Sequence, residues 1–522
     1  MSEQTIHRGP RDAAGPREWV GLAVLALPTL VLALDMSVLY LAAPALAADL
    51  QPSSTQQLWI IDIYGFMIAG FLITMGSLGD RIGRRRLLMI GALVFVVASI
   101  VAAFSTSGAM LIATRALLGI AGATLMPSTL ALISNMFAQP RQRTVAISIW
   151  ISCFMSGMAL GPIVGGLLLE TFWWGSVFLL AVPVMALLLV TAPLLLPEYR
   201  ATRAVRLDLP SVVLSLATIL PFVYGLKQIA AYGPSTVAVG SMAAAAALAV
   251  IFVRRQRILD DPLVDLGLFA NRAFTTALLA ILISTAAGGG LYLLATQYLQ
   301  LVEGLSPLAA GLWLIPTGVA SVAGALAAPR LAARFSAAGV VAAGLLGAVA
   351  GYVMLAAAQP GAGLALVVAG IALVFFGGGP ISALGTDLVV GSVPPAKAGS
   401  AASMSETGTE LGISLGVALL GSLGAAVYRS RIDLPDGLSA EAAGRADDSL
   451  TGATEIARDL PAPTASELID SAQDALTAGL NLAALVAAAV IGILALVTAI
   501  MLRERPAHAV ASSSHSETDD AR

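Results

Sequence analysis

The stretch LWIIDIYGFMIAGFLITMGSLGDRIGRRR, residues 58–86, decides the class of fold. Residues 58–79 carry a single charge, Asp62, and are long enough to cross a bilayer, which takes roughly 20 apolar residues in a helix. Glycines and a cluster of arginines follow directly. Because basic residues gather at the cytoplasmic ends of membrane helices, this stretch predicts a span that ends inside the cell.

The composition of the whole chain agrees with that stretch. Of the 522 residues, 58% are hydrophobic and 11% charged, with a mean hydropathy of +0.89. A soluble domain carries about 25% charged residues, so the chain is predicted to be an integral membrane protein. The only cysteine is Cys153, and the three histidines lie in the polar ends. No metal cluster or catalytic triad is apparent, so we expect no cofactor, no enzymatic activity and no nucleic-acid partner.

Apolar runs separated by polar breaks predict an all-α fold of fourteen spans. If both termini are cytoplasmic, 22 of the 28 basic residues lie on the inner side, as the positive-inside rule requires. The runs fall at about 19–43, 57–79, 86–105, 109–132, 144–169, 175–196, 207–226, 235–253, 273–300, 308–329, 336–358, 363–388, 399–427 and 477–502.

A weak internal repeat divides these spans into two halves. Segments 58–81 and 312–330 share a Leu-Trp start, a glycine-rich middle and a basic end, and repeated halves are common in transporters. The predicted organisation is a cytoplasmic tail (1–18), a six-helix bundle (19–197), two inserted helices (198–254), a cytoplasmic loop (255–272), a second six-helix bundle (273–502) and a cytoplasmic tail (503–522).

Segment 429–475 is not a span, since it carries ten acidic and four basic side chains. The predicted topology places it outside the cell. Its sequence favours two short helices, the second starting with a capping pattern at Thr464 or Ser466. Two interpretations remain open: a solvated loop, or an external gate beside the exit path.

Charged residues inside spans are functional candidates because they are costly to insert. Asp35, Asp62 and Arg115 are predicted to lie at one depth in the outer half of the membrane. A nearby arginine favours an ionised carboxylate and desolvation favours a protonated one, so the three could exchange protons. The alternative is a fixed structural ion pair.

Glu406 and Glu410 lie four residues apart in the run 399–427, and therefore on one helix face. Two like charges at low dielectric do not both ionise easily, so one should hold a proton or meet a cation. The alternative is a water-facing helix surface. With Asp35 and Asp62 they outnumber Arg115, which predicts a cationic cargo.

The lack of a phosphate-binding loop in the sequence bears on the energy source. Neither lysine, Lys227 nor Lys397, lies in a phosphate-binding loop. A proton gradient read by buried carboxylates remains the expected drive.

Three motifs together resemble the major facilitator superfamily. They are GSLGDRIGRRR (76–86), LIATRALLGIAGA (111–123) and GMALGPIVGG (157–166). The first looks like the signature cytoplasmic loop, in which glycines permit a tight turn and charges form an interdomain latch. The third looks like the antiporter motif, a glycine stripe for close packing with a proline kink. The implied latch residues are Gly76, Asp80, Arg81, Gly83, Arg84 and Arg85, and the implied antiporter residues are Gly157, Gly161, Pro162, Gly165 and Gly166.

A finer resemblance, over roughly residues 17–502, is to the fourteen-helix drug:proton antiporters that export quaternary ammonium compounds. It rests on TQQLWIIDIYGF (55–66), QYLQLVEGLSPLAAGL (297–312) and SETGTELG (405–412). The resemblance implies Asp35, Asp62 and Arg115 in proton coupling. It implies Glu406 and Glu410 as acidic cavity residues. Asp35 and Tyr40 complete the predicted substrate site, with the Tyr40 ring as a surface on which flat dyes would stack.

The resulting expectation is a monomeric antiporter of the bacterial cytoplasmic membrane. It would exchange protons for lipophilic monovalent cations, such as ethidium-like dyes, by rocking of two bundles. Span 308–329 lacks the acid that extends some such pumps to divalent drugs, so weak export of divalent drugs is predicted. The alternative function is export of an endogenous antibiotic or lipid-like metabolite.

Overall fold

The chain is helical throughout the part that the structure, a computed structural model, describes: residues 14–200, 208–259, 262–361, 363–393, 398–436 and 438–501. No strand occurs in these ranges, because a backbone inside a bilayer must satisfy its own hydrogen bonds. Most of the predicted tails, 1–18 and 503–522, lies outside them. The elements are α1 (Pro16–Leu50), α2 (Ser54–Ile82), α3 (Arg84–Ala103), α4 (Gly108–Met136), α5 (Pro140–Thr171), α6 (Ser176–Leu179), α7 (Ala181–Leu195), α8 (Leu209–Tyr232), α9 (Thr236–Ile258), η1 (Leu266–Ala270), α10 (Arg272–Gln297), η2 (Tyr298–Val302), α11 (Pro307–Trp313), α12 (Ile315–Ala332), α13 (Ala337–Leu355), α14 (Leu364–Gly391), α15 (Ala398–Arg431), α16 (Ala440–Asp448), α17 (Leu450–Ala457) and α18 (Ala462–Met501).

The described residues form thirteen helices long and apolar enough to span a membrane, and the bent α5 makes a fourteenth. The bend in α5, 42° between Val145–Met158 and Leu160–Thr171, lies beside Pro162. Proline bends a helix there because it lacks an N–H and its ring clashes with the preceding turn. The fourteen predicted spans are confirmed, including the two inserted ones, α8 and α9.

Two of the predicted spans are continuous across the membrane but have an interrupted hydrogen-bond ladder. The sixth divides into α6 and α7 at Leu180, three residues before Pro183, and the tenth into α11 and α12 at Leu314, two residues before Pro316. In both cases the proline removes a backbone donor from the next turn, so the ladder of hydrogen bonds is interrupted. The apolar periodicity did not predict these breaks.

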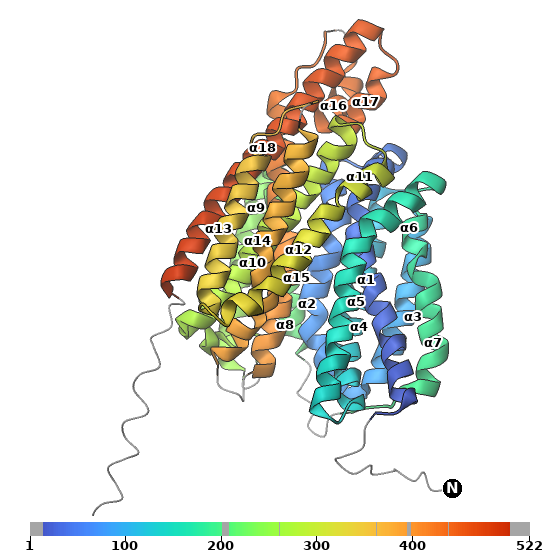
Figure 1. Cartoon of the computed structure of the whole chain (residues 1–522). Coiled ribbons are helices and arrows are strands. Elements are labelled where there is room, and N and C mark those ends of the chain that lie inside the picture. Colours follow the sequence, from blue (N-terminus) through green and yellow to red (C-terminus); the bar gives the residue numbers. More distant parts are fainter. Residues whose placement is uncertain are drawn as a thin grey trace, which may run out of the picture.

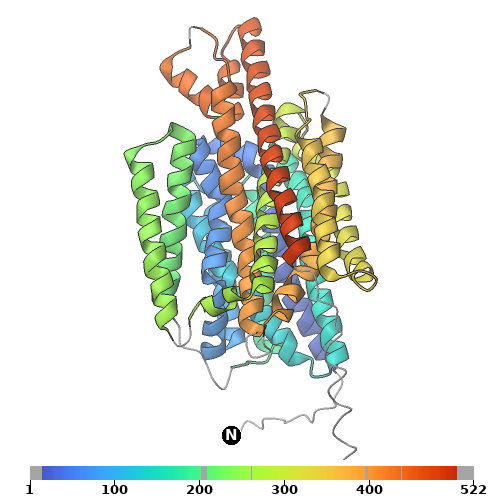
Figure 2. The ribbon, with the colours of Figure 1, turned by 90° about the vertical axis from the view of Figure 1, so that its left-hand side faces the viewer.

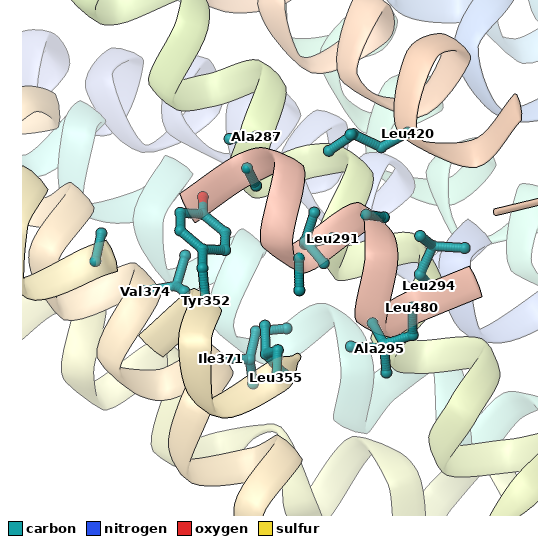
Figure 3. Packing of buried hydrophobic residues seen from close by; sticks show 14 of the residues in the cluster. Ala287, Leu291, Leu294, Ala295, Tyr352, Leu355, Ile371, Val374, Leu420 and Leu480 are labelled. Carbon is teal, nitrogen blue, oxygen red and sulfur yellow. The ribbon is translucent and has the colours of Figure 1, made fainter. Parts of the chain in front are cut away.

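The helices pack as two groups (Figure 1) beside a separate pair (Figure 2). In the first group α1 packs on α5 and α7, and α4 on α2 and α3; in the second, α10 packs on α15, and α14 on α12 and α13. The pair α8–α9 stands at the edge of the molecule, where α8 contacts both α2 and α15 (Figure 2). Figure 3 shows the core of the second group, where Tyr352 and Leu355 of α13 and Leu291 of α10 belong to one buried cluster.

The acidic segment folds differently from its prediction. It forms α16 and α17, but the second short helix expected from Thr464 or Ser466 is the start of the last span. Helix α18 runs without interruption from Ala462 to Met501, forty residues. No polar break separates the acidic residues from the apolar run, so one helix continues through both. Helices α16 and α17 project beyond the end of the bundle opposite the N-terminus (Figure 1).

Candidate transport site

Arg115 and Asp35 form a buried ion pair between α4 and α1. Arg115 Nη1 donates to Asp35 Oδ2 at 2.8 Å, and the side chains are 2% and 7% exposed. Arg115 Nε also donates to the carbonyl of Ile60 on α2 at 3.2 Å, and the guanidinium lies 4.3 Å from the ring centroid of Tyr64. Arg115 on α4 therefore bonds to both α1 and α2. The predicted proximity of Asp35 and Arg115 is present in this structure.

Asp62 belongs to a second pair that sequence reasoning missed. Its Oδ2 lies 2.8 Å from Nζ of Lys227 on α8, and both side chains are fully buried. The approach falls outside hydrogen-bond geometry, and Asp62 Oδ1 has no hydrogen-bond partner among the described residues. The expected single group of Asp35, Asp62 and Arg115 is thus two separate pairs.

The signal for Lys227 was present in the sequence. The predicted seventh run, 207–226, ends one residue before Lys227. Helix α8 continues to Tyr232, so the lysine lies inside it. This revises the count of buried charge: Asp35 and Asp62 are each matched by a cation, and the acidic excess rests on Glu406 and Glu410.

Glu406 and Glu410 lie on α15, which faces α2. Glu410 is 2% exposed, and its Oε2 has no hydrogen-bond partner among the described residues. Glu406 is half-buried. A Cβ placed on Gly65 of α2 would lie 3.6 Å from the carbonyl oxygen of Glu410, so this turn of α15 lies against α2 one turn beyond Asp62. A buried carboxylate oxygen with no donor needs a proton or a cation.

Aromatic rings connect the two groups of helices near these carboxylates. Tyr40 on α1 meets Tyr292 on α10 edge to face, with centroids 5.2 Å apart. Tyr292 in turn meets Phe375 on α14 at 5.8 Å. The row Tyr40–Tyr292–Phe375 crosses from one group to the other, and aromatic faces attract cations. Tyr298, at the start of η2, hydrogen-bonds Glu303 and the carbonyl of Gln359.

The loop between α2 and α3 makes its contacts within the first group of helices. Asp80 accepts from Arg84 Nε at 2.9 Å, and Glu198, beyond α7, accepts from the backbone N–H of Arg85 at 3.1 Å. Gly83 has φ +114°, a conformation that favours glycine. The latch partner expected in the other group is not seen among the described residues, and residues 394–397, before α15, are outside them. The interdomain latch of Gly76, Asp80, Arg81, Gly83, Arg84 and Arg85 stays a prediction.

The glycine stripe of α5 allows backbones to touch. A Cβ on Gly161 would collide with Ser37 of α1, and one on Gly165 would lie 2.7 Å from Val38. A Cβ on Gly166 would lie 2.5 Å from Cα of Leu308 on α11, in the other group of helices. Gly157 packs on the carbonyl of Leu30, and the carbonyl of Pro162 packs on Gly311. The motif therefore packs α5 against α1 on one side and α11 on the other.

A polar cluster joins α2, α8, α15, α16, α17 and the C-terminal end of α1, on the side that carries α16 and α17. Asp448 of α16 accepts from Ser54 N–H at 2.7 Å and Ser54 Oγ at 2.8 Å. Arg429 of α15 lies 3.3 Å from Asp448 and donates to the carbonyl of Ala230 on α8 at 2.7 Å. Gln51 donates to Glu455 of α17 at 3.2 Å. The acidic segment is thus bonded to the start of α2, and we call these residues the cap cluster.

A cavity of about 570 Å³ lies elsewhere, among α12, α13 and α14. It is lined by apolar side chains and glycines, with Ser336 its one polar residue, and no charged residue borders it. It lacks the carboxylates that a cation site needs, so the paired charges and aromatic row remain the candidate site. Among the described residues no group of three potential metal ligands occurs.

Comparison with known proteins identifies the family. The model described as Major Facilitator Superfamily matches residues 25–417, which contain both ion pairs and the glycine stripe. The chain belongs to the major facilitator superfamily.

Within the superfamily the similar relatives are drug exporters. The chain is 45% identical to the multidrug efflux pump LfrA of Mycolicibacterium smegmatis over 93% of this chain and 97% of that protein. It is 35% identical to the methyl viologen resistance protein SmvA of Salmonella typhimurium over 88% and 93%. It is 31% identical to a tetracenomycin C resistance and export protein of Streptomyces glaucescens over 95% and 94%.

A solved structure shares the fold at low identity. The inward-facing, unoccupied structure of a bacterial homolog of the human lysosomal transporter Spinster matches with a TM-score of 0.64 and 18% identity, over 95% of this chain and 100% of that one. The family match and the drug-exporting relatives, together with this fold, make the chain a multi-pass drug-efflux transporter of the major facilitator superfamily. It is a protein of the bacterial cytoplasmic membrane and not an enzyme.

Proposed function

We propose that this transporter exchanges protons for lipophilic cationic drugs, exporting them across the cytoplasmic membrane by alternating access. The observation that carries the proposal is the charge inside the bundle. Each of Asp35 and Asp62 lies 2.8 Å from its own cation. Glu410 is buried with a carboxylate oxygen that has no hydrogen-bond donor among the described residues. A cation entering beside Glu410 supplies the missing positive charge.

Proton coupling follows from the two ion pairs. A proton on Asp35 cancels its attraction to Arg115, which also holds Ile60 of α2. Such a change alters the contacts among α1, α2 and α4, so it favours a different arrangement of these helices. In this scheme protons load from the side bearing the cap cluster, and the drug loads from the opposite, cytoplasmic side. The cluster and the Gly166–Leu308 contact then close the outer side while drug loads.

The range of cations is open to test. Methyl viologen is a dication, and a 35% identical relative is named for resistance to it. Glu406 and Glu410 together could balance two positive charges, which argues against the weak divalent export expected from span 308–329. Both a monovalent and a divalent substrate belong in the experiment.

The test is efflux of ethidium and of methyl viologen from cells that express the wild type or Asp35→Asn, with and without a protonophore. We expect wild-type efflux that the protonophore stops and that Asp35→Asn lacks. Glu467→Gln on α18, an exposed carboxylate, is the matched control and should transport normally. Absence of efflux from well-expressed wild type would reject cationic drugs as substrates. It would direct the search to antibiotics or lipid-like metabolites, as the Streptomyces relative suggests.

A further inference from the structure

Lys227 is held in a place where an isolated ammonium group is unfavourable. Its side chain is fully buried, and Nζ has Asp62 Oδ2 at 2.8 Å and the Trp59 ring centroid at 3.9 Å. An ammonium group removed from water is stable only with a close counter-charge, and the face of an indole ring adds attraction. Both partners belong to α2. Lys227 therefore depends on α2 for its charge balance.

The helix that carries Lys227 contacts both groups of helices. Apolar side chains seal α8 to α2 and α15, with Val223 of α8 packed beside Phe66 of α2 and Ala418 of α15. Three residues beyond Lys227, the carbonyl of Ala230 accepts from Arg429 of α15 at 2.7 Å. One turn of α8 is thus tied to the first group through a charge and to the second through a hydrogen bond.

Protonation of Asp62 would change this turn directly. Asp62 Oδ1 has no hydrogen-bond partner among the described residues and can accept a proton without breaking another bond. The added proton takes the pair from zero net charge to +1 and leaves the ammonium of Lys227 without a counter-charge. A cationic drug bound beside Glu410 would then be repelled. Mutual exclusion of proton and cationic cargo is what antiport requires.

The other charged groups on neighbouring helices do not replace Asp62. Arg115 on α4 is engaged by Asp35, and Arg429 at the outer end of α15 lies with Asp448. Glu406 and Glu410 on α15 carry the substrate charge in the proposed function. Asp62 is the carboxylate within ion-pair distance of Lys227 among the described residues.

We propose that Lys227 is a positioning residue that couples protonation of Asp62 to movement of the α8–α9 pair against α2. The inserted pair is then a working part of the antiport cycle. This inference rests on the proposed proton-coupled function. It predicts that removing the Lys227–Asp62 charge pair impairs proton coupling and leaves recognition of ethidium intact.

The first experiment compares Lys227→Met, Lys227→Arg and the charge-neutral double variant Asp62→Asn with Lys227→Met, each purified into proteoliposomes. We expect the double variant to fold with wild-type thermal stability and to keep ethidium counterflow, an exchange that needs no proton gradient. Uptake driven by a pH gradient should fall by about tenfold or more, and protons released per ethidium bound should fall by one. Lys227→Arg should retain coupling. Wild-type uptake and proton release in the double variant would make the pair a structural tether and overturn the proposal.

A second experiment does not depend on transport. Gly70 of α2 faces Leu216 of α8, since a Cβ on Gly70 would lie 2.5 Å from Leu216 Cδ2. Cysteines at both positions, with Cys153 replaced by serine, report the contact through their rate of disulfide formation. At each pH this rate is compared with that of the same cysteine pair in the double variant, which cancels thiol ionisation. The ratio should fall on acidification. A ratio that does not change with pH overturns the proposal. If the ratio falls on acidification but the wild type does not transport ethidium, only the proposed function is contradicted.

Discussion

Glu410 and Glu406 differ in burial, which separates their expected contributions to binding. Glu410 is 2% exposed and has an oxygen without a donor among the described residues, whereas Glu406 is half-buried. We expect Glu410→Gln to weaken ethidium binding by roughly 30-fold or more, since removing one partner of a buried charge pair costs about 2–5 kcal/mol. Fluorescence titration of the purified protein measures this directly.

Glu406→Gln should distinguish substrates by valence. A dication needs both carboxylates and a monocation needs one, so this variant should lose methyl viologen efflux and keep most ethidium efflux. Glu467→Gln serves as the control in the same assay. An equal loss of methyl viologen efflux and ethidium efflux would mean that Glu406→Gln disturbs the protein in general and that Glu406 does not balance the second positive charge.

The depth of the charged residues in the membrane could be predicted from the sequence, but the helix that each side chain faces could not. Counting residues from the helix ends placed Asp35, Asp62 and Arg115 at one level, and Asp35 and Arg115 do meet. The rotation of α2 sends Asp62 toward α8 instead. That rotation depends on packing with Val212, Leu216 and Val223, apolar residues that carry no distinguishing sequence signal.

Among elements, the contact between α5 and α11 is sensitive to added volume. Gly166→Ala places a methyl group 2.5 Å from Cα of Leu308, a backbone atom that cannot rotate away. Overpacking of this kind costs about 1–3 kcal/mol, so we expect a lower melting temperature and weaker closure of the outer side. A Cβ on Gly240 of α9 meets nothing within 4 Å, which makes Gly240→Ala the matched control.

The control should be neutral or slightly stabilising, because alanine is favoured over glycine within a helix by about 1 kcal/mol. A Gly166→Ala protein as stable and as active as Gly240→Ala would show that α5 and α11 tolerate separation. The glycine motif would then have no function in closing the outer side.

Apolar periodicity predicts some features of the helices and not others. The bilayer forces every spanning segment to be apolar and helical, so the number of spans and their approximate positions could be predicted. Breaks at Leu180 and Leu314, and the continuation of α18 through an acidic stretch, depend on local backbone geometry. Hydropathy does not report that geometry.

For the whole molecule, two carboxylate–cation pairs predict two protons per cycle. Exchange of two protons for one monovalent cation moves one net positive charge inward, so ethidium export should be driven by membrane potential at about 2.3 kcal/mol per 100 mV. Export of the dication methyl viologen should be electroneutral. Proteoliposomes with potassium gradients and valinomycin set the potential independently of pH. A rate of ethidium export that does not depend on membrane potential would mean that only one of the two pairs exchanges its proton during the cycle.

Helix α18 has a consequence for how this protein can be studied. Its forty residues extend for about 60 Å, twice the roughly 30 Å hydrocarbon core of a bilayer, so much of the helix stands in water beside α16 and α17. A membrane protein with few features outside the bilayer is hard to align in electron micrographs and hard to raise binders against. This helical projection is a folded epitope, and its bonds from Asp448 and Glu455 to Ser54 and Gln51 join it to the first group of helices. An antibody fragment that recognises the joined surface would serve as a fiducial marker and would select one conformation from the population.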